Sequence, residues 1–310
     1  MEFCSGSKKR QDVRCADALF SLASLFANTG RSSEAKRHFK RAEKIYRTVL
    51  AANRDGSGRA AKNLAALYQL TDQPEAAASV YAGITTQFRK RGRLGEDEYF
   101  ALLNKMSFLY QILDQPKKAA VALREFLKIR RQMYGEMDTA YAGALDGLAT
   151  VLSTLGRSAE ALACHDDSLR IYETVVGTHH TEYANTLNNR AFLLEEMGKT
   201  AEAVLAHQRV LEIRRECLGL HHTEVADSLM NLAFLHREMG HPDEAKALFQ
   251  EALAILAAGG LDPAKLAEGT RKVRELIAEM HDHRLRRLEV SGFTPGQAEE
   301  ISRLHTPNFM

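Results

Sequence analysis

Two histidine pairs come closest, by residue type and spacing, to a chemical site in this sequence. His179-His180 and His221-His222 lie 42 residues apart in predicted loops between helices. Imidazole nitrogens bind zinc at about 2 Å, so ligands of one ion must converge on one point. The two pairs are expected to be separated by one layer of helices, roughly 10 Å, which is too far for shared coordination. We therefore interpret them as a repeated helix cap and predict no metal site.

Other patterns of catalytic chemistry are also missing from the sequence. His281 and His283 are two residues apart on a predicted helix, so they point to different faces. Cys164 adjoins His165 on a face expected to be buried, where a thiol is inert. No phosphate-binding loop, GxSxG, HExxH or zinc-type Cys/His spacing occurs. The sequence therefore predicts a protein that is not an enzyme, with no catalytic residue and no cofactor.

The composition is that of an average globular protein. Of 310 residues, 45% are apolar and 26% are charged, which excludes wholesale disorder and a collagen-like chain. The longest apolar run, 252–258, is far short of the roughly 20 residues of a membrane span, so no membrane partner is expected. The N-terminus has no apolar signal region, and the four cysteines show no CxxC pair or framework spacing. A reducing, cytoplasmic location is predicted.

An internal repeat of 42 residues organises most of the chain. A marker residue, glycine or aspartate, recurs at this period, and an alanine stands five residues after each marker. Another small residue precedes each marker by seven positions. The markers are Gly30, Asp72, Asp114, Gly156, Gly198 and Gly240, and the alanines are Ala35, Ala77, Ala119, Ala161, Ala203 and Ala245. Six alanines in phase indicate a six-unit array.

Each unit has the pattern of two amphipathic helices. The marker ends the first helix in a left-handed residue, for which glycine is the easiest choice and aspartate a tolerated one. Proline follows two residues later in three units, at the first turn of the second helix. Residues able to cap the next first helix recur as well. The prolines are Pro74, Pro116 and Pro242, and the expected caps are Asp55, Asp97, Thr139, Thr181 and Thr223.

These patterns predict an all-α fold, an α-solenoid of six helix-turn-helix repeats in one continuous array followed by a C-terminal capping helix. Small residues where the two helices cross let the backbones approach, and stacked pairs bury a shared core. The predicted segments are a disordered 1–11, repeats at 12–51, 55–92, 97–135, 139–177, 181–219 and 223–258, a capping helix at 262–289 and a short helix and tail at 290–310.

The repeats resemble the tetratricopeptide repeat, in the 42-residue form of kinesin light chains and nephrocystin. The similarity lies in Leu64-Ala65, Tyr68, Ala77 and Tyr81, in Leu232-Ala233, Ala245, Phe249 and Ala252, and in the phrase Leu220-His-His-Thr-Glu224. The chain departs from the pattern at Arg190, which replaces a core leucine, and at His165 and His207, which replace an aromatic residue. The resemblance implies a right-handed superhelix whose first helices line a concave groove for a peptide or helix of another protein.

The polar face of the first helices is the candidate groove. Asparagines share its registers, and an amide can pair with any extended peptide backbone because it both donates and accepts. The resemblance implies that role for Asn63, Asn189 and Asn231; ordinary solvated side chains are the alternative. Two phenylalanines one turn further on can form apolar pockets or pack against the neighbouring unit. The predicted groove residues are Asn63, Asn104, Asn188, Asn189, Asn231, Arg59, Lys62, Lys105, Phe192 and Phe234.

Charge is distributed unevenly along the chain. Residues 1–134 hold 25 Lys and Arg against 13 Asp and Glu, a balance of +12, whereas residues 135–310 hold 17 against 27, a balance of −10. Cations at one end would steer an acidic partner segment, and the opposite ends could pair in an oligomer. An alternative function is RNA binding by the basic half. It has few stacking rings, because its candidates Tyr68, Tyr81 and Tyr110 occupy core-type positions.

Overall fold

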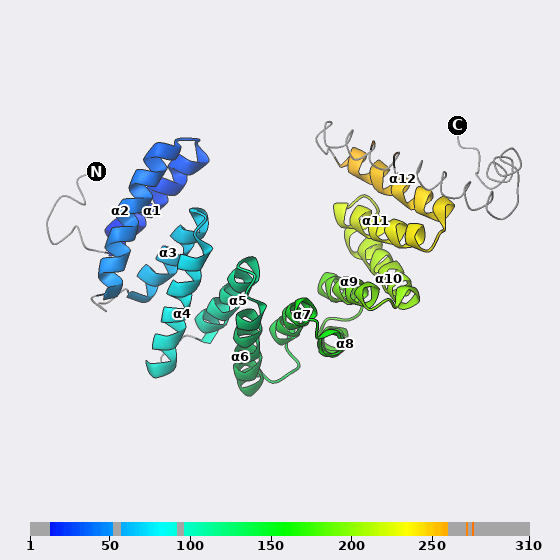
Figure 1. Ribbon diagram of the computed structural model, residues 1–310, viewed down its shortest axis with the longest axis horizontal. Coiled ribbons are helices and arrows are strands. Elements are labelled where there is room, and N and C mark those ends of the chain that lie inside the picture. Colours follow the sequence, from blue (N-terminus) through cyan, green and yellow to red (C-terminus); the bar gives the residue numbers. More distant parts are fainter. Residues whose placement is uncertain (1–12, 52–56, 92–95, 260–270, 272–274, 276–310) are drawn as a thin grey trace, which may run out of the picture. The chain divides into compact units, whose positions relative to one another are not determined.

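The computed structural model describes residues 13–51, 57–91 and 96–259, together with Arg271 and Glu275. Within these ranges the chain forms twelve helices and no strand (Figure 1). The helices are α1 Val13–Asn28, α2 Ser32–Ala51, α3 Ser57–Leu70, α4 Pro74–Arg91, α5 Glu96–Ile112, α6 Pro116–Tyr134, α7 Thr139–Thr154, α8 Ser158–Val175, α9 Thr181–Glu196, α10 Thr200–Leu218, α11 Thr223–Glu238 and α12 Pro242–Ala258. The predicted segment 1–11 and, apart from those two residues, the predicted capping helix and tail lie outside the described residues.

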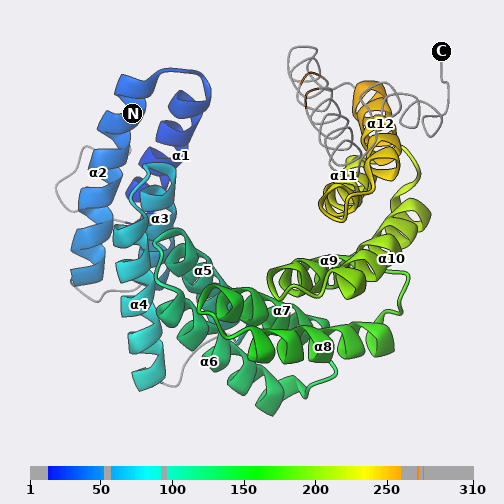
Figure 2. The same cartoon turned by 45° about the vertical axis from the view of Figure 1, so that its right-hand side comes forward.

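The chain divides into two compact units. Unit 1 runs to Gly135 and takes in Thr154–Gly156, and unit 2 comprises Glu136–Ser153 and the chain from Arg157 onward. In unit 1, α1 packs on α2, α3 on α4 and α5 on α6, and each pair contacts the next (Figure 2). In unit 2, α9 pairs with α10 and α11 with α12 in the same way. The predicted all-α repeat solenoid is confirmed; that the six pairs form one continuous array stays a prediction.

The turn inside each helix pair is built as the repeat predicts. Gly30, Gly156, Gly198 and Gly240 have φ between 71° and 78°, and Asp72 and Asp114 have φ of 55° and 51°. This left-handed residue lets the chain turn back and satisfy the last carbonyls of the first helix. After α9, for example, the amide of Lys199 donates to the carbonyl of Leu194 at 2.8 Å. Pro74, Pro116 and Pro242 are each the first residue of a second helix.

Small side chains occupy the crossing of the two helices in every pair. The six phased alanines of the second helices are at most 3% exposed, and their partners on the first helices at most 5%. Those partners are Ala23, Ala65, Ser107, Ala149, Ala191 and Ala233. Because a methyl group keeps the backbones close, the larger apolar side chains extend to the neighbouring pair and join the layers. One such cluster in unit 2 includes Leu211, Val225 and Ile255.

The caps of the first helices in unit 2 differ from the prediction by one residue. Thr181 and Thr223 are the first helical residues, and the caps are the histidines before them. The side chain of His222 accepts a hydrogen bond from the amide of Glu224 at 3.3 Å, and His180 does the same for α9. Asp138 takes this place at α7. The interpretation of the histidine pairs as caps is therefore confirmed for their second members, while the assignment to threonine is wrong.

Candidate functional site

Each unit has a first-helix face, the polar surface of its first helices, which are α1, α3 and α5 in unit 1 and α7, α9 and α11 in unit 2. The predicted groove residues lie on this face, on α3 and α5 in unit 1 and on α9 and α11 in unit 2. In unit 2, hydrogen bonds cross this face from one first helix to the next. The Nδ2 of Asn189 donates to the Oδ2 of Asp146 at 2.9 Å, which joins α9 to α7. The Nδ2 of Asn231 donates to the Oδ1 of Asn188 at 3.3 Å, which joins α11 to α9. These two bonds are the rungs of unit 2.

The rungs follow the repeat. Asp146 and Asn188 are 42 residues apart, as are Asn189 and Asn231, so each rung joins an acceptor to the amide 43 residues later. The amides thus hold successive first helices in register with one N–H each. A primary amide has a second N–H and a carbonyl oxygen. Within the described ranges, the oxygens of Asn189 and Asn231 accept no hydrogen bond, so they remain able to bind a partner.

Asp17 and Asp146 are acceptors that the sequence pattern did not single out. In unit 1, Asp17 accepts from Asn63 at 2.7 Å and from the Tyr46 hydroxyl at 2.8 Å, and the Nε of Arg59 lies 3.2 Å from it. Burial, and next the bond to Asp17, raise the pKa of Tyr46. Asp17 therefore joins α1, α2 and α3. Spacing from the amides could have found Asp146, but not Asp17, which lies 46 residues before Asn63.

Asp146 of the first-helix face also contacts His165 of α8. His165 is 1% exposed, and its Nδ1 lies 2.8 Å from the Oδ1 of Asp146. His207, at the same place one repeat later, is fully buried with its Nε2 2.6 Å from Glu195. Both histidines replace the aromatic residue of the repeat pattern. Each is accommodated in the core because a carboxylate of a first helix satisfies one ring nitrogen.

Phenylalanine rings are the exposed apolar groups of the face. Phe192 and Phe234 are 41% and 40% exposed. Each ring also packs edge-on, with centroids 5.1 Å apart, against a second-helix ring of its own repeat, His207 for Phe192 and Phe249 for Phe234. Each ring therefore contacts its own repeat, and packing against the neighbouring repeat stays a prediction. Phe108 of α5 shares their register and is 60% exposed; the period itself could have identified it.

The remaining predicted residues lie on α3 and α5, and Arg190, a departure from the repeat pattern, lies on α9. Asn104 and Lys105 are exposed on α5, and Lys62 is half-buried on α3. Arg190 is also half-buried, and its Nε donates to Asp166 of α8 at 2.7 Å. Arg190 therefore fills a core position with its aliphatic stem while its charge is paired at the edge.

Arg214 is a buried cation that no sequence pattern singled out. It is 8% exposed on α10, and burial lowers its pKa. Its guanidinium donates to Asn185 of α9 at 2.9 Å and to Ser228 of α11 at 2.9 Å, and it lies 3.3 Å from the carboxylate of Glu224. One side chain thus joins α9, α10 and α11. The fork of guanidinium donors is suited to this because it reaches several acceptors at once.

Two features are absent from the described part of the chain, a cluster of metal ligands and a membrane-spanning helix. No cluster of three or more His, Cys, Asp and Glu residues could hold a metal ion there. Nor is any described helix long and apolar enough to cross a bilayer.

Cys164 and Cys217 are free thiols. The cytoplasmic location stays a prediction.

Family models match three parts of the chain. One tetratricopeptide repeat model matches residues 136–216 and 182–258, and another matches residues 16–49. A model of anaphase-promoting complex subunit 5 matches residues 86–143. No sequence among the curated proteins matches the chain.

Solved structures share the fold at low sequence identity. BtubC (BKLC) from P. vanneervenii is 19% identical with a TM-score of 0.59, and the match covers 84% of this chain and 95% of that one. Kinesin-light-chain-like repeats from Podosopora anserina are 20% identical with a TM-score of 0.56, over 66% of this chain and 97% of that one. At such identity the likeness concerns the arrangement of helices.

Proposed function

Since the chain belongs to the tetratricopeptide repeat family, whose members generally mediate protein–protein interactions, we propose that it is a non-catalytic adaptor. It binds an extended segment of a partner protein across the first-helix face of unit 2. The observation that carries this proposal is the pair of exposed rings, Phe192 and Phe234, beside the amides of α9 and α11. Apolar rings at one register on a polar helix face favour a binding surface.

The two kinds of side chain have complementary tasks. An apolar side chain of the partner buries area against the phenyl rings, which are rigid and are held from behind by His207 and Phe249. The oxygens of Asn189 and Asn231 accept from the partner's backbone, irrespective of its sequence. In unit 1, Asn104, Lys105 and Phe108 offer the same combination with a cation added, which suits an acidic segment.

RNA binding is the weaker candidate. Unspecific binding of a single strand relies on aromatic rings on which bases stack. Of the three candidate rings, Tyr68 and Tyr81 are each 1% exposed, and Tyr110 is half-buried. The hydroxyl of Tyr68 is also bonded to Glu43 at 2.8 Å. The burial of Tyr68 and Tyr81 therefore favours a protein-binding adaptor over an RNA-binding protein.

Affinity capture with matched variants tests the proposal. The tagged full chain is incubated with cell lysate with and without nuclease, recovered proteins are identified by mass spectrometry, and the segment that binds is titrated by calorimetry. We expect F192A/F234A to weaken that binding at least tenfold, since each ring buries apolar area worth about 1 kcal/mol or more. L205A is the control, because Leu205 is exposed on the second helix α10.

Two outcomes contradict the proposal: recovery that is lost with nuclease, or equal weakening by L205A and F192A/F234A. Alanine at Asn63, Asn189 and Asn231 is a less clean test. Those variants remove hydrogen bonds between helices as well as any contact with a partner.

A further inference from the structure

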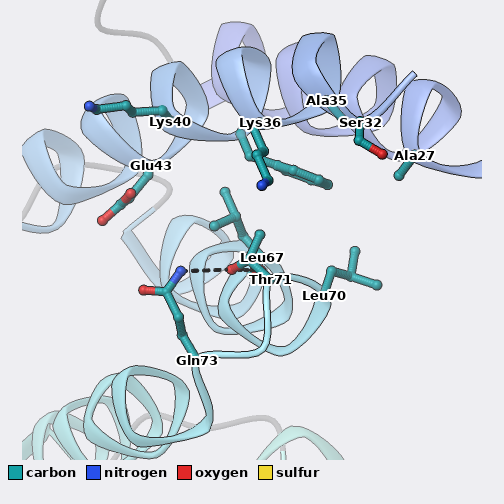
Figure 3. Close-up of a pocket in the computed structure, with 11 residues that line it drawn as sticks. Ala27, Ser32, Ala35, Lys36, Lys40, Glu43, Leu67, Leu70, Thr71 and Gln73 are labelled. Carbon is teal, nitrogen blue, oxygen red and sulfur yellow. Dashed lines mark hydrogen bonds between the residues drawn. The ribbon is translucent and has the colours of Figure 1, made fainter. Parts of the chain in front are cut away.

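A cleft in unit 1 opens between α2 and the C-terminal end of α3, away from the groove residues described above. It has a volume of about 590 Å³. The second helix α2 contributes most of its lining, and the end of α1, the end of α3 and the turn before α4 contribute the rest (Figure 3). The amide of Gln73 donates to the hydroxyl of Thr71 at 2.9 Å and closes the side formed by the turn.

The inner wall of the cleft is apolar. Ala35, Phe39 and Leu67 line it and are 2–6% exposed, so they form a fixed surface rather than a flexible rim. Leu70 lines the opening with 62% of its surface exposed to solvent. Covering a surface of this kind with an apolar side chain of another molecule lowers the free energy, because apolar area is removed from water.

The charged rim of the cleft is positive. Lys36 extends from α2 toward α3 (Figure 3), and Lys40 follows it one turn later. Within the described ranges neither ammonium group has an ion-pair partner. The acidic residue of the lining, Glu43, is already engaged, because it accepts from the Tyr68 hydroxyl at 2.8 Å and from the Nε of Arg47 at 2.9 Å.

We propose that this cleft is a second docking site, which takes a leucine or phenylalanine flanked by carboxylates in an acidic segment of a partner protein. The apolar wall accepts the side chain, and Lys36 and Lys40 pair with the carboxylates on either side. Complementary charge selects the partner: the lysines would repel a basic segment, and a neutral polar one would leave Leu70 exposed. The site does not depend on the first-helix face.

A defined peptide tests this site by fluorescence anisotropy with the full chain. The labelled, end-capped probe has the sequence Asp-Glu-Leu-Phe-Asp-Glu. Two matched peptides replace its acids by lysine or its Leu-Phe by serine. We expect the probe alone to bind, and its affinity to fall between 0.05 and 0.3 M salt, since exposed ion pairs are screened over about a Debye length.

Each substitution in the cleft can be compared with a control substitution at an exposed position elsewhere in unit 1. K36S/K40S should weaken the probe about fivefold, because two exposed ion pairs are lost, and L70S should weaken it about tenfold. K44S, on the same helix outside the lining, and L25S, exposed on α1, should leave the affinity unchanged. F192A/F234A should also leave it unchanged, which separates this site from the proposed function.

Three results would overturn the proposal. The first is equal binding, or equal absence of binding, of all three peptides. The second is an equal effect of K44S and K36S/K40S. The third is self-association of the wild type in sedimentation velocity that K36S/K40S abolishes, which would make a second copy of the chain the occupant.

Discussion

At the residue scale, the structure is decided by polar groups that a pattern of apolar residues does not reveal. Asp17, Asp146 and Arg214 each collect two or more hydrogen bonds from different helices. Each is therefore a point where one substitution releases several helices. A carboxylate or guanidinium is used because its several oxygen or N–H sites diverge toward different partners.

Arg214→Ala should lower the free energy of unfolding by about 2–3 kcal/mol, since it leaves the buried hydroxyl of Ser228 without this donor and removes the hydrogen bond to Asn185. Thermal and urea denaturation followed by circular dichroism measure this. Arg209→Ala is the control: Arg209 pairs with Glu212 at the surface of the same helix, so its loss should cost less than about 0.5 kcal/mol. Similar losses in both variants would show that the hydrogen bonds of Arg214 do not account for its contribution to stability.

His38 predicts a pH dependence of stability in unit 1. Its ring is 3% exposed, and burial, then the charges of Arg37 and Arg41, lower its pKa below 6.5, against a smaller opposing effect of Glu34. As the pH falls below 6.5, the unfolded chain binds a proton that the folded chain does not, so stability decreases toward acid until the lowered pKa is reached.

The variant His38→Phe should remove this part of the pH dependence. It keeps the stacking on Phe26, whose ring centroid lies 5.4 Å from that of His38. Urea unfolding at pH 7.5 and 5.5 should show a larger loss for the wild type than for His38→Phe. A loss of equal size in both proteins would mean that His38 does not contribute.

At the scale of the helices, much of the fold could be predicted because the signals are local and repeated six times. Markers, prolines and phased alanines depend on backbone conformation and close approach, which act within a few residues. The candidate site could be predicted less well from the sequence. The rungs depend on which helices become neighbours, and the Phe192–His207 contact depends on side-chain geometry at a crossing. Only positions sharing the 42-residue register, such as Phe108, could have been found by extension.

The turn residues give a matched set of backbone predictions. Gly198→Ala should cost about 1 kcal/mol, because alanine must adopt a φ of 72° there. Gly83 lies in the middle of α4, where an added methyl group would meet no atom within 4 Å. Gly83→Ala should therefore stabilise the folded chain by about 0.5–1 kcal/mol. Asp114→Gly should also stabilise, since Asp114 already has a φ of 51°. Melting temperatures measure all three, and a uniform sign would refute the assignment of backbone strain.

The rungs predict a difference between two chemically identical substitutions. Asn189→Asp places a carboxylate against that of Asp146, whereas Asn231→Asp faces Asn188, whose amide can turn and donate. Asn189→Asp should therefore cost about 1–2 kcal/mol more in denaturation at pH 7. Equal effects at pH 7 would show that the two rungs do not hold the first helices together.

At the scale of the whole molecule, the near-neutral charge of +2 is the difference between a basic and an acidic half. The cleft with its unpaired lysines lies in the basic half, and the exposed pair Phe192 and Phe234 in the acidic one. The two proposed sites therefore differ in electrostatic preference. An adaptor with two such surfaces can hold two different partner segments, each selected by charge before its apolar side chain is buried.

Stability should be local in such a molecule, because each helix pair gains its free energy from its own packing and from its immediate neighbours. The variant Arg214→Ala tests this in the full chain. Hydrogen exchange followed by mass spectrometry should show faster exchange of α9, α10 and α11, the helices that Arg214 joins. Exchange of α1 to α4 should be unchanged, since none of their residues contacts the altered side chain. Arg209→Ala serves again as control and should alter neither region. Faster exchange throughout the chain would instead mean that all the repeats unfold together, and then a partner bound on either unit would stabilise both.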